Sequence, residues 1–213
     1  MRQYFMLFTF GALACLLAGA CSEEVVDSDG VVSIGGIPTQ VGPVWVYAVI
    51  DSLSIPATLD TVTVTATREA TLSGGTPAVV WSFSGAGFTV TKFVALLPTG
   101  IRIQESSRNE FLSEDFVLPM TTGDSWRQLS EREYDSSEVP FLGAVVTRAT
   151  TFQRSAKVER TWGFAFGSRT GESVTWIADG VGIVHRHIIK YSPTNPGTII
   201  SNEVWDLISY QLN

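Results

Sequence analysis

The sequence predicts an all-β protein built from antiparallel meanders, and three observations support this prediction. Short runs rich in β-branched and aromatic residues recur along the chain, which is the composition of strands. Gly, Pro and Ser separate these runs, as expected of turns. No long segment shows the 3.6-residue periodicity of a helix. About ten strands at spacings of roughly 8–15 residues predict a curved sheet, a half-barrel or a sandwich.

The N-terminal half contains five runs of this kind. They are VWVYAVIDSL (44–53), TLDTVTVTATR (58–68), AVVWSFS (78–84), GFTVTKFVALL (87–97) and GIRIQE (100–105). The segment that follows, 105–117, is the one candidate for a helix, and its serine and asparagine content disfavours that alternative.

The C-terminal half contains five further runs. They are FLGAVVTRATTF (141–152), VERTWGFAF (158–166), ESVTWIA (172–178), VGIVHRHIIKY (181–191) and EVWDLISYQL (203–212). We therefore expect two meanders of five strands each. Because the edges of such meanders are prone to aggregation, we expect one sheet to close against the other.

Tryptophan-containing motifs recur at one displacement along the chain. Gly42-x-x-Trp45 and Trp81-x-Phe83 are each matched 81 residues later, by Gly123-x-x-Trp126 and Trp162-x-Phe164. Gly100-Ile101 matches Gly182-Ile183 at 82 residues. We interpret this as a single duplication, since the period exceeds the roughly 20–50 residues of repeat arrays. The alternative is that strands of β domains simply begin with tryptophan. The predicted repeats are 43–118 and 119–213, which share one core.

The N-terminus has the layout of a secretory signal peptide over residues 1–20. Arg2 is its only charged residue and precedes the apolar run 4–20, which ends in small residues. This run is at the lower limit of the ~17–25 residues that span a bilayer, so a retained anchor helix is an alternative. Beyond it, residues 21–42 are acidic and rich in glycine, which predicts a flexible tether.

The junction Ala18-Gly19-Ala20-Cys21 resembles the lipobox of bacterial lipoproteins. The resemblance implies cleavage before Cys21 and acylation of that residue, and Ser22 in place of aspartate implies transport to the outer membrane. An ordinary cleavage site, which would leave Cys21 unacylated, is the second alternative. Cys15 lies in the segment to be removed, so Cys21 is the single thiol expected in the mature chain. An unpaired thiol in an exported protein needs an explanation, and acylation supplies one.

The charge balance restricts the partners of the chain. Removal of Arg2 leaves 13 basic against 21 acidic residues, a net charge of −8. This argues against nucleic acid, which requires a basic surface. It also disfavours electrostatic adhesion to anionic lipids. The acyl anchor at Cys21 is therefore the predicted contact with the membrane, with an envelope protein or an apolar ligand as further candidate partners.

Two motifs in the body resemble those of poorly characterised bacterial envelope lipoproteins. They are LPMTTGDSW (118–126) and WIADGVGIVHR (176–186). The resemblance implies a fold similar to the curved half-barrel sheets of lipoprotein-carrier proteins, whose concave face would hold an apolar ligand. The candidate ligand-binding residues are Trp126, Trp162 and Trp176. The alternative is that these tryptophans are ordinary core residues.

Motifs for catalysis are absent from the sequence. No nucleophile elbow, zinc-protease motif, phosphate-binding loop or dinucleotide fingerprint occurs. We therefore predict no enzyme, no catalytic residue and no cofactor. The alternative is a hydrolase using a pair of the carboxylates between residues 105 and 138.

The segment 181–191 contains the remaining candidate site. Alternation along a strand places His185 and His187 on one face, where they are candidate metal ligands; the alternative is a solvated rim. We expect Arg186 or Lys190 to pair with acids of a neighbouring strand, because unpaired cations rarely lie in a core.

The function predicted from these features is a non-enzymatic envelope lipoprotein that serves as an adaptor or accessory subunit of an assembly. The alternative is a carrier or sensor of a lipid or other apolar ligand. A filled interior with an exposed apolar patch favours the adaptor. A large cavity lined by tryptophan and phenylalanine favours the carrier.

Overall fold

The computed structural model describes residues 34–85, 87–105, 113–130, 133–164, 167 and 169–212. Within these residues all regular structure is strand. The strands are β1 (Val44–Asp51), β2 (Thr58–Thr71), β3 (Pro77–Gly85), β4 (Phe88–Leu97), β5 (Gly100–Gln104), β6 (Glu114–Val117), β7 (Ser125–Leu129), β8 (Glu133–Val146), β9 (Thr151–Phe164), β10 (Arg169–Ala178), β11 (Gly182–Tyr191) and β12 (Ile199–Gln211). The described part of the chain contains no helix with the length and apolarity to span a membrane. The predicted signal peptide, Cys21 and the tether as far as residue 33 lie outside the described residues.

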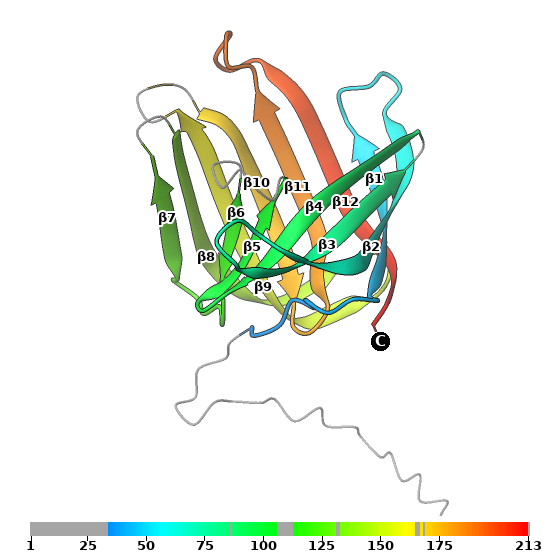
Figure 1. Cartoon of the computed structure of the whole chain (residues 1–213). Helices are drawn as coiled ribbons and strands as arrows, with labels where there is room; N and C mark the ends of the chain where they lie inside the picture. Colours follow the sequence, from blue (N-terminus) through cyan, green and yellow to red (C-terminus); the bar gives the residue numbers. More distant parts are fainter. Residues whose placement is uncertain are drawn as a thin grey trace, which may run out of the picture.

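All twelve strands belong to one antiparallel sheet, in the order β6-β5-β4-β3-β2-β1-β12-β11-β10-β9-β8-β7. Two consecutive meanders, β1–β6 and β7–β12, therefore join where β1 pairs with β12. The sheet curls into a nearly closed, barrel-like wall (Figure 1). This confirms the predicted all-β fold of antiparallel meanders, in its curved-sheet form.

Each meander has six strands where the sequence predicts five. The two additional strands, β6 and β7, come from polar segments, as does the first half of β8, which extends a predicted strand. Residues 114–117, part of the candidate helix, form β6, while 106–112 lie outside the described residues. The predicted strand 141–152 contains the end of β8, a turn in which Thr147 N donates to Thr150 O, and the start of β9.

The two edge strands, β6 and β7, are held together by side chains. The indole Nε1 of Trp126 on β7 donates to the backbone oxygen of Asp115 on β6 at 2.9 Å. On β9, Arg160 Nη2 donates to the backbone oxygen of Ser113 at 3.0 Å. These bonds cover part of an edge that would otherwise present unpaired backbone groups.

One end of the barrel is closed by the chain that precedes β1. Ile34 and Met120 exchange two backbone hydrogen bonds of 3.0 and 2.9 Å, and Gly180 N donates to Gly36 O at 3.0 Å. This segment lies along the lower end in Figure 1. Side chains with less than 2% exposure fill the core, among them Ile34, Trp45, Met120, Ile177 and Leu207. Burial of their apolar surface is the main stabilising contribution to the fold.

The repeated motifs occupy corresponding strands. Trp45 and Trp126 are each the second residue of the first strand of a meander, β1 and β7. Trp81 and Trp162 lie on the third strands, β3 and β9. Gly42 and Gly123, which precede the first strands, both have positive φ, 114° and 93°, a conformation that favours glycine. The duplication itself stays a prediction.

Candidate functional site

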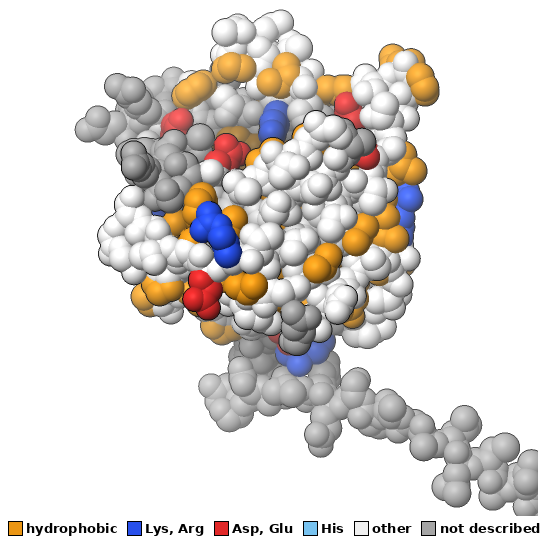
Figure 2. All heavy atoms as spheres, turned by 45° about the vertical axis from the view of Figure 1, so that its right-hand side comes forward, with side chains coloured by type: hydrophobic (Ala, Val, Ile, Leu, Met, Phe, Trp, Pro, Cys, Tyr) orange, Lys and Arg blue, Asp and Glu red, His pale blue; other side chains and the backbone are white. Residues whose placement is uncertain are grey.

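The other end of the barrel opens into two adjoining cavities. We call the cavity of about 770 Å³ the polar chamber and that of about 450 Å³ the apolar chamber. Both volumes fall within the ~300–1,000 Å³ of typical ligand sites. At the upper end of the molecule, charged and hydrophobic side chains are both visible among the loops (Figure 2). Residues beside the turns at this end belong to both linings, Asp51 and Thr58 to one and Ser130, Phe164 and Pro193 to the other. The open end is therefore the entrance to both chambers.

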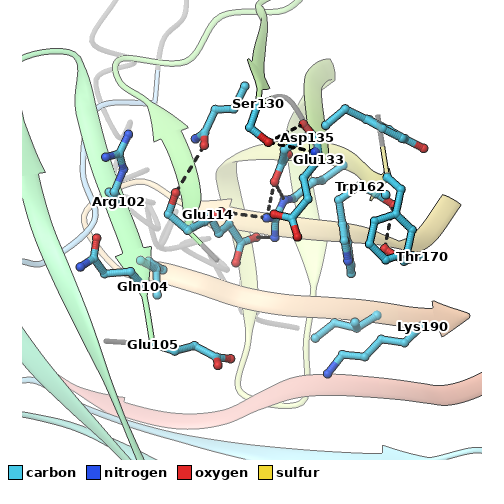
Figure 3. A pocket seen from close by; sticks show the side chains of 18 of the residues that line it. Arg102, Gln104, Glu105, Glu114, Ser130, Glu133, Asp135, Trp162, Thr170 and Lys190 are labelled. Carbon is cyan, nitrogen blue, oxygen red and sulfur yellow. Dashed lines mark hydrogen bonds and ion pairs between the residues drawn. The ribbon is translucent and has the colours of Figure 1, made fainter. Parts of the chain in front are cut away.

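The polar chamber is lined by side chains near the upper ends of strands from both meanders (Figure 3). Its charged residues are Lys92, Arg102, Glu105, Glu114, Glu133, Asp135, Arg160, Arg186 and Lys190. Gln104, Gln128, Tyr134 and Thr170 add uncharged hydrogen-bonding groups. This lining can hydrogen-bond a polar group of considerable size.

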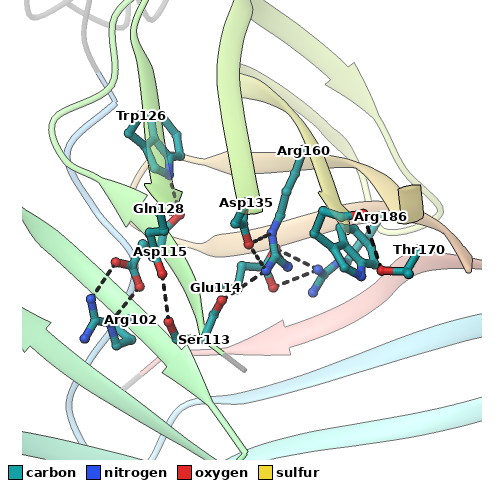
Figure 4. A network of polar contacts seen from close by, with 11 residues as sticks. Arg102, Ser113, Glu114, Asp115, Trp126, Gln128, Asp135, Arg160, Thr170 and Arg186 are labelled. Atoms are coloured by element: carbon teal, nitrogen blue, oxygen red, sulfur yellow. Dashed lines mark hydrogen bonds and ion pairs between the residues drawn. The ribbon is translucent and has the colours of Figure 1, made fainter. Parts of the chain in front are cut away.

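A network of two acids and two arginines crosses the polar chamber (Figure 4). Arg186 Nη2 on β11 lies 2.7 Å from both carboxylate oxygens of Glu114 on β6. Arg160 Nη1 on β9 lies 3.6 Å from Glu114, and Arg160 Nε donates to Asp135 Oδ2 on β8 at 2.8 Å. Because four strands contribute, the network connects β6 at one sheet edge to the opposite wall.

The network keeps Glu114 ionised. Burial alone would raise the pKa of Glu114, but Arg186 and Arg160 outweigh it and hold that pKa below its usual value. Burial would lower the pKa of Arg160, but Glu114 and Asp135 hold it above its usual value. At neutral pH Glu114 is therefore a carboxylate that accepts hydrogen bonds and has no proton to donate.

Trp162 is the one predicted ligand-binding tryptophan that lines a chamber. The Arg160 guanidinium carbon lies 4.8 Å from the centroid of its ring, a cation–π contact. Gly171 lies opposite on β10, and a Cβ atom there would come within 2.1 Å of Trp162 Cζ2. Glycine at 171 thus makes room for the indole along the chamber wall.

The apolar chamber is lined mainly by aromatic and branched side chains. These include Tyr47, Val49, Val62, Val64, Trp81, Phe83, Phe88, Val90, Ile183 and Trp205. The Trp205 ring contacts Tyr47 and Phe83 edge to face, with centroid distances of 5.9 and 6.3 Å. The Tyr47 hydroxyl donates to Ile183 O at 2.7 Å, and burial raises its pKa. Tyr47 is therefore an uncharged part of the wall.

Three cations line both chambers and mark their junction: Lys92 on β4, and Arg186 and Lys190 on β11. The Lys92 ammonium lies 3.9 Å from Glu105 Oε1 and 5.7 Å from the centroid of the Phe83 ring. Burial lowers the pKa of Lys92, with further lowering by the charges of Arg186 and Lys190, against the opposing effect of Glu114 and Glu105. The folded protein therefore disfavours the charge of Lys92 at this junction.

The other predicted ligand-binding residues lie elsewhere. Trp126 binds Asp115 at the sheet edges and is not part of either chamber lining. Trp176 pairs in register with Lys157 and His185, on the strand face opposite the chambers, and packs against Phe141 with a centroid distance of 6.0 Å. Ligand binding by these three tryptophans stays a prediction.

The two predicted metal ligands also lie on the face opposite the chambers, because they alternate with Arg186. His185 Nδ1 is 3.3 Å from Asp206 Oδ1, and His187 Nε2 is 2.8 Å from Asn202 Oδ1. No group of three or more His, Cys, Asp and Glu residues with the geometry of a metal site occurs in the described part of the chain. Metal binding by the two histidines stays a prediction.

Residues that sequence reasoning missed form the centre of the site. The expected pairing of Arg186 with an acid is present, but Glu114 comes from β6, which does not neighbour β11 in the sheet. The local sequence does not distinguish residues that line a cavity from ordinary core residues, and this holds for Lys92, Trp81 and Trp205. Only the closure of the sheet brings them together.

Comparison with known proteins gives limited information. No protein-family model matches the chain, and no curated protein matches it. Two solved structures are similar, each with 14% sequence identity over 84% of this chain and a TM-score of 0.49. One is a Bacteroides fragilis protein assigned as exported with a YmcC-like fold, covered over 100% of its length. The other is a Parabacteroides distasonis protein assigned as a lipoprotein, covered over 99%. Similarity at this level assigns no function to this protein.

Proposed function

We propose that this protein is a non-enzymatic lipoprotein of the bacterial cell envelope that carries or senses an amphiphilic ligand inside its barrel. The observation that carries the proposal is the apolar chamber of about 450 Å³, whose wall includes Trp81, Phe83 and Trp205. A cavity lined by aromatic side chains is the feature that distinguishes a carrier from an adaptor with a filled interior. The adaptor role stays a prediction from the sequence.

The charge network supports binding over catalysis. A carboxylate pair that hydrolyses glycosides needs one acid whose pKa is raised so that it can donate a proton. Glu114 has the opposite shift, because Arg186 and Arg160 stabilise its charge. Each acid of the network contacts an arginine. These groups fix the wall of the chamber.

The proposed anchor is an acyl group on Cys21. The first described residue, Ile34, lies at the closed end of the barrel, where it pairs with Met120. An anchor upstream of Ile34 is therefore connected to the body at the end away from the entrance. The sequence between Cys21 and Ile34 can span at most ~45 Å when extended. This arrangement leaves the entrance free to exchange ligand, and the outer membrane is the proposed location.

The anchor is tested by replacing Cys21 with Ala in the full exported chain. We expect the Cys21→Ala protein to leave the membrane fraction and become soluble, because the acyl chain is the proposed membrane contact. Mass spectrometry of the wild type should show the added acyl mass on Cys21. Wild-type protein without an acyl group on Cys21 contradicts the lipoprotein assignment, and an uncleaved wild-type N-terminus favours a retained helix.

The chamber is tested with the fluorescent apolar probe N-phenylnaphthylamine and the soluble Cys21→Ala protein. Val90 lines the apolar chamber and is 47% exposed, so Val90→Trp narrows the chamber with little risk to folding. Val146, which is 75% exposed and not part of the chamber lining, provides the matched control Val146→Trp. We expect the probe to fluoresce on binding and Val90→Trp alone to weaken binding about tenfold. If the unmodified chamber gives no fluorescence increase, the carrier proposal is wrong.

A further inference from the structure

The junction between the two chambers carries more positive charge than the fixed network neutralises. Arg160 and Arg186 are paired with Glu114 and Asp135. Among the described acids, Glu105 is the one within ion-pair distance of Lys92, at 3.9 Å, and the Glu105 side chain is 62% exposed. Such a pair contributes little. In the described part of the chain, no carboxylate lies within ion-pair distance of Lys190.

The remaining acids of the apolar chamber bind other groups. Asp51 accepts from Leu53 N and Ser54 Oγ, and Asp60 accepts from the amide of Thr61. Glu203 accepts from Ser201 Oγ and Trp205 Nε1, both at 3.0 Å. Among the cations that line the two chambers, Lys92 and Lys190 are thus the ones whose charge is least compensated by the described acids.

Two further donors in the chamber lining have no acceptor among the residues that the structure describes. Trp81 Nε1 and Arg186 Nε are buried and, among the described residues, have no hydrogen-bond partner. Buried donors of this kind are normally satisfied by water or by a ligand. A ligand group made only of acceptors, such as a carboxylate or a phosphate, matches a site composed of donors and cations.

The junction also lies between an apolar and a polar environment. Five residues belong to both linings: Lys92, Ile103, Arg186, Ile188 and Lys190. The apolar chamber on one side is enclosed by aromatic and branched side chains, and the polar chamber on the other side holds the charge network. A molecule that occupies both must have an apolar and a polar part.

We propose that the ligand is an anionic amphiphile whose acidic head lies between Lys92 and Lys190 and whose apolar tail fills the apolar chamber. This inference rests on the proposed carrier function and specifies its ligand class. The head is a carboxylate or a phosphate, which share the required chemistry, and any larger polar part extends into the polar chamber. Burial, and then the charges of Arg186 and Lys190, lower the pKa of Lys92. An anion bound between Lys92 and Lys190 would offset this cost of the Lys92 charge.

The test compares ligands that share one acyl chain and differ in head charge. Palmitate, palmitoyl lysophosphatidic acid, monopalmitin and palmitoylcholine are titrated against probe-loaded Cys21→Ala protein, with inorganic phosphate alone as a head without a tail. We expect at least one acid to displace N-phenylnaphthylamine at about tenfold lower concentration than uncharged monopalmitin. Palmitoylcholine should be the weakest of the four. Which acid binds better separates a carboxylate from a phosphate head.

Lysine variants locate the head. Lys92→Met and Lys190→Met should each weaken binding of the preferred acid about tenfold and leave monopalmitin unchanged. Lys157→Met is the matched control, since Lys157 is 30% exposed against 31% for Lys92 but lies outside both linings and pairs with Glu159. The Lys157→Met substitution should leave the affinity for the preferred acid and for monopalmitin unchanged.

Three results overturn the inference while leaving the carrier function intact. The first is equal binding of the acids and monopalmitin, which shows that head charge is not recognised. The second is unchanged acid binding in both lysine variants. Displacement by inorganic phosphate as effective as by the acids also overturns it, because the tail would then contribute nothing. Failure of the probe itself to bind, in contrast, rejects the proposed function.

Discussion

Glu114 and Arg186, 72 residues apart in the chain, form a charge pair across the interior, with Arg186 Nη2 at 2.7 Å from each carboxylate oxygen. Glu114 lies on the edge strand β6, and Arg186 lies on β11 in the other meander. Since the pair is 9% and 15% exposed at its side chains, it is largely shielded from solvent. The contact therefore holds the free edge of the sheet against the opposite wall.

Replacing Glu114 with Gln should lower the free energy of unfolding by about 2–3 kcal/mol. The substitution keeps the shape but leaves two partly buried arginines with one acid fewer, and removal of one partner from a buried pair is strongly destabilising. Urea denaturation followed by tryptophan fluorescence measures the change. Glu159→Gln is the control, because the Lys157–Glu159 pair is 30% and 40% exposed and such pairs contribute less than about 0.5 kcal/mol. Equal effects of the two substitutions contradict this role of Glu114.

The contribution of Glu114 should depend on pH in one direction. Its pKa in the folded protein lies below the ordinary value of 4.5, so the ionised carboxylate stabilises the folded state above that pH. This stabilisation is lost as the pH falls through the folded pKa. The stability difference between wild type and Glu114→Gln should therefore be constant near neutral pH and shrink below pH 4.5. A difference that grows on acidification contradicts the assigned direction of the shift.

Lys92→Met should stabilise the unliganded protein while weakening ligand binding. The pKa of Lys92 is lowered on folding, so at neutral pH its charge is less favourable in the folded than in the unfolded state, a cost that disappears as the pH approaches 10.5. Methionine keeps an unbranched apolar side chain without the charge. We expect a rise in Tm of about 2 °C by calorimetry. Lys157→Met, which removes an exposed pair on the outer wall, should give no rise.

Gly171→Ala should displace Trp162. The added Cβ would lie 2.1 Å from Cζ2 and 2.3 Å from Cε2 of the indole, so the ring must move, and overpacking of this kind costs about 1–3 kcal/mol. Denaturation measures the loss, and near-UV circular dichroism reports the changed surroundings of the ring. Gly35→Ala is the control, because a Cβ atom at residue 35 would have no other atom within 4 Å. An unchanged near-UV spectrum in Gly171→Ala would show that Trp162 does not pack there.

The strands that could be predicted from the sequence differ from those that could not in the polarity of the residues on their inner faces. β2 alternates threonine with the buried Val62, Val64 and Ala66, which identifies it as a half-buried strand. β3 is a short run of buried apolar residues that includes Val80 and Trp81, which is also typical of a strand. The first half of β8 instead carries Glu133 and Asp135 toward the polar chamber, so its pattern lacks the apolar alternation that identifies a half-buried strand. The polar inner face of this part of β8 thus removed the signal by which the strand could be recognised.

The candidate site was less predictable than the fold because it depends on contacts between distant segments. Alternation correctly placed His185 and His187 on one face of β11, but nothing local indicated that Arg186, between them, points to the chambers. Likewise Trp162 and Trp176 carry similar sequence patterns, yet one lines the polar chamber and the other packs on Phe141. The closure of the sheet, which brings β6 opposite β11, determines both that Arg186 faces the chambers and which of the two tryptophans lines one.

The central claim is that the barrel holds an amphiphilic molecule, and native mass spectrometry of the soluble Cys21→Ala protein, isolated from the envelope without detergent, tests it most directly. We expect a fraction of the protein to carry a discrete additional mass that dissociates as an acidic lipid-like molecule. That fraction should fall in Val90→Trp and be unchanged in Val146→Trp, since only Val90 lines the apolar chamber. Protein that carries no additional mass, and acquires none when incubated with palmitate or palmitoyl lysophosphatidic acid, would contradict the account.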